Sequence, residues 1–270
     1  KLEFNDLYIV NENPMLIQRL ANKHAKGQML NYIIGFLIFF LFLHWIPNML
    51  SVFLPASMLD YMTIPEGFDR ENFADYPIVV AFYAIAFEGA LMLGQALYVL
   101  TFIRNKSCEY GSLFEGFQFF FKALIMTIVQ DLIIMMWTLL FIIPGIIAWY
   151  GFRQSYFILA DNPNKGIMQC LAESKARMTG NKMNLFKLDL TYVPYILVAL
   201  APKFIVPYFG LSSTTVAGML LLIVADIPVA IANAYMYLGR GAFYELLISH
   251  GFANFKYFNQ DVFRNNAGEY

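Results

Sequence analysis

Long apolar runs, separated by short polar connections, constrain this chain more than any other feature of its sequence. Residues 29–54 are almost wholly apolar. A helix of about 20 residues, at about 1.5 Å rise per residue, crosses the roughly 30 Å hydrocarbon core of a bilayer. With 59% hydrophobic and 14% charged residues, the whole chain is typical of a membrane protein and unlike an ordinary water-soluble domain.

Six apolar runs are interpreted as transmembrane helices, which predicts an all-α polytopic membrane protein. Their predicted bounds are residues 29–54, 77–102, 123–143, 146–160, 190–209 and 215–238. Pro47 is expected to disturb the first span near its far end. In the second span, Ala90 and Gly94 have the small-xxx-small spacing that favours close packing of another helix.

The chain divides into three predicted regions. Residues 1–28 form a cytoplasmic leader with a surface helix near residues 15–24, residues 29–239 form the six-helix transmembrane domain, and residues 240–270 form a cytoplasmic tail. The leader lacks the hydrophobic region of a signal peptide, so the first span is expected to be retained.

The stretch of residues 141–190 decides the predicted topology. If Pro144-Gly145 only kinked one long helix, the basic residues of 153–187 would fall outside, against the rule that basic short loops stay in the cytoplasm. A tight turn at Pro144-Gly145 places them inside instead. All but two of the 18 basic residues, Arg70 and Lys203, then lie on the cytoplasmic side, together with both termini.

A soluble connection at residues 164–187 has the periodicity of an amphipathic helix. One helical face carries Ile167, Leu171, Ser174 and Met178, and another carries Gln169, Glu173 and Arg177. We therefore predict an interfacial helix between spans four and five that stops at Gly180-Asn181. A basic face near anionic headgroups is expected from Lys175, Arg177, Lys182 and Lys187.

Four charged residues fall near the middle of predicted spans: Glu88, Asp131, Arg153 and Asp226. A central charge costs about 2.5 to 3.5 kcal/mol on translocon scales, so these groups are expected to form a polar network inside the bundle or in a wet cavity. A hairpin at Pro144-Gly145 would bring Asp131 and Arg153 within reach of each other.

Two interpretations of these charges stay open at this point. In the functional one, the three acids line a cation or proton path and Arg153 is their fixed counter-charge. In the structural one, Asp131 and Arg153 form a pair that ties the hairpin together, while Glu88 and Asp226 lie near span ends or in small aqueous pockets.

Other functions have little support in the sequence. It contains no HExxH, GxSxG or P-loop pattern, so we expect no enzyme activity and no cofactor, and the residues around Asp131 and Asp226 do not favour an aspartyl hydrolase. Cys108 and Cys170 lack metal-ligand spacing. A net charge of -1 provides no basic excess for binding nucleic acid.

Several short blocks in the middle of the chain resemble one family. They are Ile143-Pro144-Gly145, Leu159-Ala160-Asp161-Asn162-Pro163, Ser174, Met178, Gly180-Asn181-Lys182 and Phe186-Lys187-Leu188-Asp189-Leu190. In this order they resemble a bacterial integral-membrane family, domain of unknown function nine-seven-five. The chain departs from the family pattern at Thr191 to Tyr195, where the family usually has Ser-Phe-Ile-Gly-Trp.

The resemblance implies a six-helix protein of the bacterial cell (inner) membrane and brings no activity with it. Physically, Asp161-Asn162-Pro163 is expected to form an Asx turn and to cap the interfacial helix. Our leading hypothesis is a non-enzymatic protein that binds or transports a small substrate, with proton coupling through the buried acids. The alternative is an accessory protein for assembly, export or self-immunity that docks on another membrane complex. The expected partners are the lipid bilayer and either a small molecule or another membrane protein.

Overall fold

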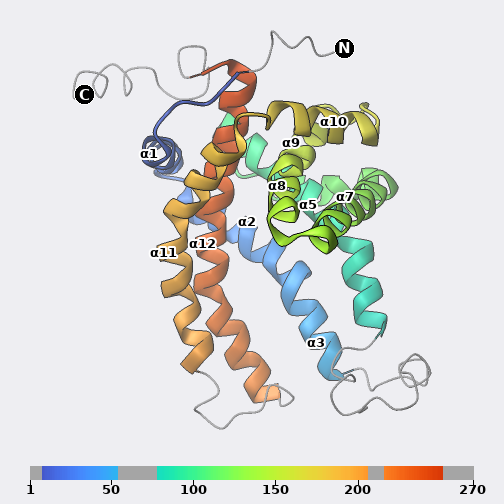
Figure 1. Cartoon of the computed structure of the whole chain (residues 1–270). Helices are drawn as coiled ribbons and strands as arrows, with labels where there is room; N and C mark the ends of the chain where they lie inside the picture. The colour runs from blue at the N-terminus through green and yellow to red at the C-terminus, as the bar shows by residue number, and fades with distance from the viewer. Residues whose placement is uncertain (1–7, 54–77, 206–215, 252–270) are drawn as a thin grey trace.

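The structure, a computed structural model, describes residues 8–53, 78–205 and 216–251, and every regular element in these ranges is helical. The elements are α1 (Pro14–Ala25), α2 (Met29–Phe40), the π-helical η2 (Leu41–Trp45), α3 (Ile46–Phe53), α5 (Ile78–Asn105), α6 (Ser112–Glu115), the 3-10 helix η4 (Gly116–Phe119), α7 (Phe120–Leu140), α8 (Ile142–Phe152), α9 (Ser155–Asp161), α10 (Ile167–Arg177), α11 (Lys182–Ile205) and α12 (Val216–Ser249). The predicted all-α fold is confirmed for these residues. Figure 1 shows α11 and α12 side by side along the length of the molecule.

Several helices are long and apolar enough to cross a membrane. Among the described residues, four qualify singly: Phe82–Asn105, Ser112–Leu140, Lys182–Ile205 and Leu220–Ser249. A fifth is obtained if α1 and the helix Met29–Trp45, which meet at a bend of 102°, are counted as one span. The structure therefore has the features of a multi-span membrane protein. That the chain has six spans and that both termini lie in the cytoplasm stay predictions.

The predicted fourth span, residues 146–160, is divided in the structure. It falls on α8, with 11 residues, and α9, with seven, which are separated by a turn at Arg153-Gln154. Each helix is shorter than the roughly 20 residues that a single straight span requires. This segment is thus a broken helix rather than one short continuous span.

The reversal between α7 and α8 lies at Phe141, three residues before the predicted turn at Pro144-Gly145. Phe141 is extended, with φ -159° and ψ 146°. Pro144 is instead the third residue of α8, where the missing amide hydrogen costs little because first-turn amides have no partner inside the helix. A Cβ on Gly145 would lie 2.2 Å from Oγ1 of Thr138, so Gly145 allows the two helices to pack closely after the turn.

The first predicted span is irregular near Pro47. The π-helical η2 separates α2 from α3 and ends two residues before Pro47, whose ring nitrogen cannot donate to the helical ladder. The disturbance predicted at Pro47 therefore takes the form of a π-helical segment on its N-terminal side.

The surface helix predicted near residues 15–24 is present as α1. Oδ1 of Asn13 accepts a hydrogen bond from the Met15 amide at 2.9 Å, and Pro14 occupies the first helical position. A buried face, formed by Ile17, Leu20, Ala21, His24 and Ala25, packs against α11 and α12. The helix is thus part of the bundle's packing.

Close packing around α5 confirms the role predicted for Ala90 and Gly94. A Cβ on Gly94 would lie 1.9 Å from the carbonyl oxygen of Leu113, and a Cβ on Gly116 would lie 2.2 Å from that of Ala90. Small residues on both sides therefore let α5 contact the backbone of α6 and η4 directly.

An aromatic cluster joins α2, α5 and α12. The ring of Tyr32 lies 4.6 Å from that of Phe102 and 5.6 Å from that of Tyr98, between ring centroids. The Tyr32 hydroxyl donates to the carbonyl oxygen of Ala234 at 3.2 Å. These fully buried contacts hold α5 against α12, the arrangement that positions the polar cavity described below.

The helix α12 continues through residue 240, where the sequence analysis placed the start of a cytoplasmic tail, and ends at Ser249. Residues 1–7, 54–77, 206–215 and 252–270 lie outside the described residues, and with them most of the predicted cytoplasmic tail. The division into leader, transmembrane domain and tail stays a prediction.

Candidate functional site

Three of the four predicted membrane charges line one cavity. Its volume is about 100 Å³, and Glu88 of α5, Asp131 of α7 and Arg153 at the end of α8 all contribute to its wall. The remaining lining residues are Met92, Ala96, Thr127, Gln130, Trp149, Tyr156, Phe157, Tyr237 and Arg240. The cavity is thus lined by charged and polar side chains from five helices, α5, α7, α8 with its C-cap, α9 and α12.

The α7–α8 hairpin explains why Asp131 and Arg153 meet. Counted from Phe141, Asp131 lies ten residues before the turn and Arg153 twelve after it, or about 15 Å and about 18 Å at the helical rise. The two residues therefore reach similar depth. Glu88 joins them because α5 packs against both α7 and α9.

Arg153 does not form the ion pair with Asp131 that the sequence analysis considered. Among the described residues, no carboxylate oxygen lies within 4.0 Å of its guanidinium. The guanidinium instead lies 4.4 Å from the ring centroid of Trp149 and 5.7 Å from that of Tyr237. The physical reason is that α8 ends at Phe152, so Arg153 lies in the turn between α8 and α9 and its guanidinium faces aromatic rings.

Two polar atoms of the cavity lining have no hydrogen-bond partner within the described part of the chain. They are Oε1 of Gln130 and Nη1 of Arg240, and both atoms are buried. An unpaired buried polar group costs about 1 to 3 kcal/mol. The cavity lining thus includes two residues, Gln130 and Arg240, that each keep a buried polar atom without a partner among the described residues.

A buried ion pair that was not predicted from the sequence lies beside this cavity. Nε of Arg240 lies 2.8 Å from Oδ1 of Asp189, and Nη2 lies 2.9 Å from Oδ2, which is a bidentate arrangement. Arg240 is 3% exposed and Asp189 is 7% exposed. The Tyr150 hydroxyl donates to Oδ2 of Asp189 at 3.2 Å. The pair therefore joins α11 to α12, and it leaves one guanidinium nitrogen, Nη1, without a hydrogen-bond partner among the described residues.

A signal for Arg240 was present in the sequence. Apolar residues continue at helical spacing beyond it, at Phe243, Leu246 and Leu247, and indicate that the last helix does not end at residue 238. The flanking glycines have packing roles, because a Cβ on Gly239 would lie 2.4 Å from the Tyr192 hydroxyl and one on Gly241 would lie 2.4 Å from a Val99 methyl.

Asp226 lies apart from the cavity. Its Oδ1 is 2.5 Å from Nζ of Lys203, which makes an ion pair between α11 and α12. The structure thus brings Glu88, Asp131 and Arg153 together and leaves Asp226 with a partner of its own.

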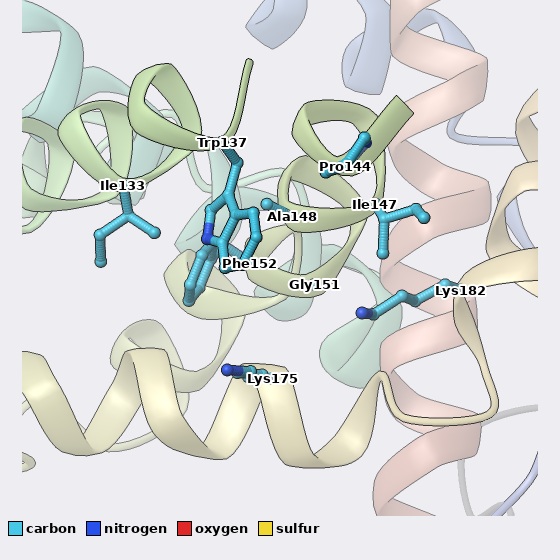
Figure 2. Close-up of a pocket in the computed structure, with 9 residues that line it drawn as sticks. All are labelled: Ile133, Trp137, Pro144, Ile147, Ala148, Gly151, Phe152, Lys175 and Lys182. Carbon is cyan, nitrogen blue, oxygen red and sulfur yellow. The ribbon is translucent and has the colours of Figure 1, made fainter. Parts of the chain in front are cut away.

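The four residues of the predicted basic face also separate. Arg177 pairs with Glu173 at 2.9 Å, and Lys187 is exposed on α11. Lys175 and Lys182 line a second pocket, of about 300 Å³, beside the α7–α8 hairpin (Figure 2). The position of α10 at a membrane interface stays a prediction.

Glu173 is held by two cations outside the candidate spans. Nζ of Lys165 lies 2.7 Å from one oxygen and Nε of Arg177 lies 2.9 Å from the other. Burial by itself raises the pKa of Glu173, but the hydrogen bonds and charges of these two residues outweigh it, so the pKa lies below its ordinary value.

Several residues of the family signature make structural contacts. The Ser174 hydroxyl donates to the carbonyl oxygen of Gly151 at 2.8 Å, which ties α10 to the end of α8. Oδ1 of Asn162 accepts from the Asn164 amide at 3.2 Å, which confirms the predicted Asx turn. The cap of α10 is Gly166, so the predicted capping role of Asp161-Asn162-Pro163 is wrong; the turn ends before the helix starts.

Asp161 and Asn181 of the signature also bind distant segments. Oδ1 of Asp161 lies 2.7 Å from Nη1 of Arg104, whose Nε in turn lies 2.7 Å from Glu245. The Asn181 side chain accepts from the Val10 amide and donates to the Tyr8 carbonyl, both at 2.8 Å. The α10 helix ends at Arg177, three residues before the stop predicted at Gly180-Asn181, and Gly180 adopts a positive φ of 82° in the turn that leads into α11.

A third pocket, of about 640 Å³, lies between α1, α11 and α12. Its lining includes the side chains of Tyr192, Tyr195 and Tyr235 and carries no charged residue. No group of three or more His, Cys, Asp or Glu side chains with metal-site geometry occurs within residues 8–53, 78–205 and 216–251.

These features define a class of protein: an all-helical chain with several apolar helices of membrane-spanning length around a cluster of charged side chains. Residues 139–250 match the model of the family described as "Protein of unknown function (DUF975)". This match confirms the resemblance that the signature blocks indicated. It includes Arg153, Asp189 and Arg240, whereas Glu88 and Asp131 precede it. No curated protein and no solved structure matches the chain.

Proposed function

We propose that the protein is a non-enzymatic protein of the bacterial cell membrane that binds a small polar substrate in the cavity between α5, α7, α8 and α12 and transports it. Protons are coupled to this transport through Glu88 and Asp131. The observation that carries the proposal is the convergence of two carboxylates and Arg153 on one cavity.

The charges of the cavity favour a substrate with both polar and charged groups. Arg240 is neutralised by Asp189, so the balance at the cavity is set by Arg153 against Glu88 and Asp131. Two acids facing one free cation in a medium of low dielectric favour one bound proton or one bound cation. Binding of a substrate cation can then displace that proton, which is the elementary step of coupling.

The larger pocket between α1, α11 and α12 is a weaker candidate for this role. It contains no charged side chain, so it offers a charged solute no compensation for lost hydration. The polar cavity offers ion pairs and hydrogen bonds.

The proposal is tested by solute-induced thermal stabilisation of the purified protein. Amino acids, dicarboxylates, polyamines and alkali-metal cations are added singly, and the melting temperature is measured. We expect one class to raise the melting temperature of the wild-type protein and not that of the Glu88→Gln/Asp131→Asn variant. Asp226→Asn is the matched control, because Asp226 lies outside the cavity.

Transport is then measured in proteoliposomes with the stabilising solute and an imposed pH gradient. Uptake that depends on the gradient and disappears in the double variant supports the proposal. Stabilisation that survives in the double variant contradicts it. A membrane protein that co-purifies in stoichiometric amount, with no response to any solute, would favour the accessory role instead.

A further inference from the structure

The pocket beside the α7–α8 hairpin combines two lysines with an apolar wall. It is lined by Ile133, Trp137, Pro144, Ile147, Ala148, Gly151, Phe152, Lys175 and Lys182. Figure 2 shows Lys175 rising from α10 and Lys182 extending from the start of α11, with Trp137 and Phe152 on the hairpin side. One end of the pocket therefore carries two ammonium groups, and the other is lined by apolar side chains.

Neither lysine has an acidic partner. Within the described part of the chain, no ion pair or side-chain hydrogen bond involves Nζ of Lys175 or of Lys182. Glu173, on the same helix as Lys175, is already held by Lys165 and Arg177. The two ammonium groups are thus free to bind an anion from outside the chain.

Gly151 places Lys182 against the pocket wall. A Cβ at this position would lie 3.6 Å from Cε of Lys182 and 3.7 Å from its Nζ, so the lysine side chain lies directly across α8 at this residue. Lys182 is accordingly only partly exposed, whereas Lys175 is exposed. The two amines reach the pocket from separate elements, α10 and α11.

The apolar wall continues onto the open surface of the hairpin. Trp137 is 48% exposed and Ile147 is 49% exposed, and both line the pocket. A free phosphate would neutralise the lysines and leave this wall uncovered. An occupant with an anionic head and a hydrocarbon chain satisfies both parts, because the chain adds apolar burial to the ion pairs.

We propose that this pocket is a binding site for an anionic phospholipid. The phosphate lies between the ammonium groups of Lys175 and Lys182, and one acyl chain lies along Ile133, Trp137 and Ile147. This inference is independent of the transport proposed above, since the polar cavity shares none of these residues. It assigns a specific ligand to two of the four residues predicted to form a basic face.

Native mass spectrometry of the delipidated, detergent-purified full chain tests the site. Phosphatidylglycerol is titrated against the wild-type protein and against Lys175→Gln/Lys182→Gln. The variant removes two cations that attract the lipid phosphate, so we expect binding to weaken about tenfold or more. Lys26→Gln/Lys187→Gln removes the same charge at exposed positions outside the pocket and should leave the affinity unchanged.

Further binding measurements identify the ligand and test the apolar wall of the pocket. Inorganic phosphate and glycerol phosphate should not displace phosphatidylglycerol at equal concentration, and phosphatidylcholine should bind more weakly. Trp137→Ala should weaken lipid binding while both lysines remain. Equal loss of affinity in the two double-lysine variants, or displacement by inorganic phosphate, would overturn the proposal.

Discussion

At the scale of single residues, the buried pair of Arg240 and Asp189 constrains how α11 packs on α12. Removing one partner leaves an uncompensated buried charge, so Arg240→Met should lower the free energy of unfolding by about 3 to 5 kcal/mol. Combining it with Asp189→Leu should restore much of this loss, because no charge is then left unpaired. The measurement is unfolding by sodium dodecyl sulfate in mixed micelles.

Lys187→Met is the control for these stability measurements, since Lys187 is an exposed neighbour of Asp189 on the same helix. Equal loss of stability in Arg240→Met and Lys187→Met would show that the pair contributes nothing.

Glu173 makes the stability of the α10 region depend on pH. Its folded pKa lies below its ordinary value of 4.5, so its stabilising contribution is present above that value and is lost as pH falls through the folded pKa. We expect Glu173→Gln to melt at a lower temperature than wild type at neutral pH, and the gap between them to close in acid. A difference in melting temperature that stays the same from neutral to acid pH would contradict the prediction. Glu115→Gln, at an exposed position, is the control.

Part of the candidate site could be predicted from the sequence. Glu88, Asp131 and Arg153 interrupt apolar runs, where the energetic cost of a charge is visible without a structure. The Arg240–Asp189 pair could not be predicted in the same way, because both residues lie at the ends of predicted runs and their contact depends on how α11 packs on α12. The partners of Arg153 are likewise a matter of tertiary packing, which placed aromatic rings rather than a carboxylate beside it.

At the scale of elements, the close contact of α5 with η4 depends on Gly116. A Cβ there would meet the Ala90 carbonyl oxygen at 2.2 Å, so Gly116→Ala should force the two elements apart and cost about 1 to 3 kcal/mol. Gly111→Ala is the matched control, because a Cβ at Gly111 meets no atom within 4 Å. Unfolding free energies of the two variants are compared, and equal values would refute the close contact.

Asn181 holds the segment before α1 against the start of α11. Its side chain bonds the backbone of Tyr8 and Val10, so Asn181→Ala should release this segment without unfolding the bundle. Hydrogen exchange should become faster at the Val10 amide and stay unchanged at the core of α5. The exposed Asn164→Ala serves as a control; unchanged protection of Val10 in Asn181→Ala would disprove the docking role.

The hairpin shows what the sequence could and could not reveal about an element. Charge asymmetry correctly required a reversal near Pro144, but the turn itself is at Phe141. Proline is tolerated in the first turn of a helix, so Pro144 marks the start of α8 rather than the loop. The glycine beside it is needed for packing against Thr138, a contact between two helices that local sequence does not disclose.

At the scale of the whole molecule, the charge asymmetry of the connections is compatible with two positions of the α7–α8 hairpin in the bilayer. A hairpin that crosses the bilayer and one that enters and leaves from the same side both keep the basic residues of 153–187 inside. The number of spans therefore depends on where Phe141 lies. In Figure 1 the connection between α7 and α8 lies at mid-height, well above the lower ends of α11 and α12.

The tip of this hairpin is suited to hydrocarbon and not to water. Its five consecutive residues, Leu139, Leu140, Phe141, Ile142 and Ile143, are apolar and between 64% and 78% exposed. The 11 residues of α8 measure about 16 Å, roughly half of a bilayer core. We therefore predict that the hairpin is re-entrant: it ends inside the membrane and returns to the cytoplasmic side.

Single cysteines in a background of Cys108→Ser and Cys170→Ala test this topology with a membrane-impermeant maleimide. Thr179→Cys should be labelled only from the cytoplasmic side and Asp60→Cys, in the predicted outer loop, only from outside. Phe141→Cys should be labelled from neither side until detergent is added, because its thiol lies in hydrocarbon. Labelling of Phe141→Cys from outside would instead establish a crossing hairpin, and with it the six spans expected from the sequence.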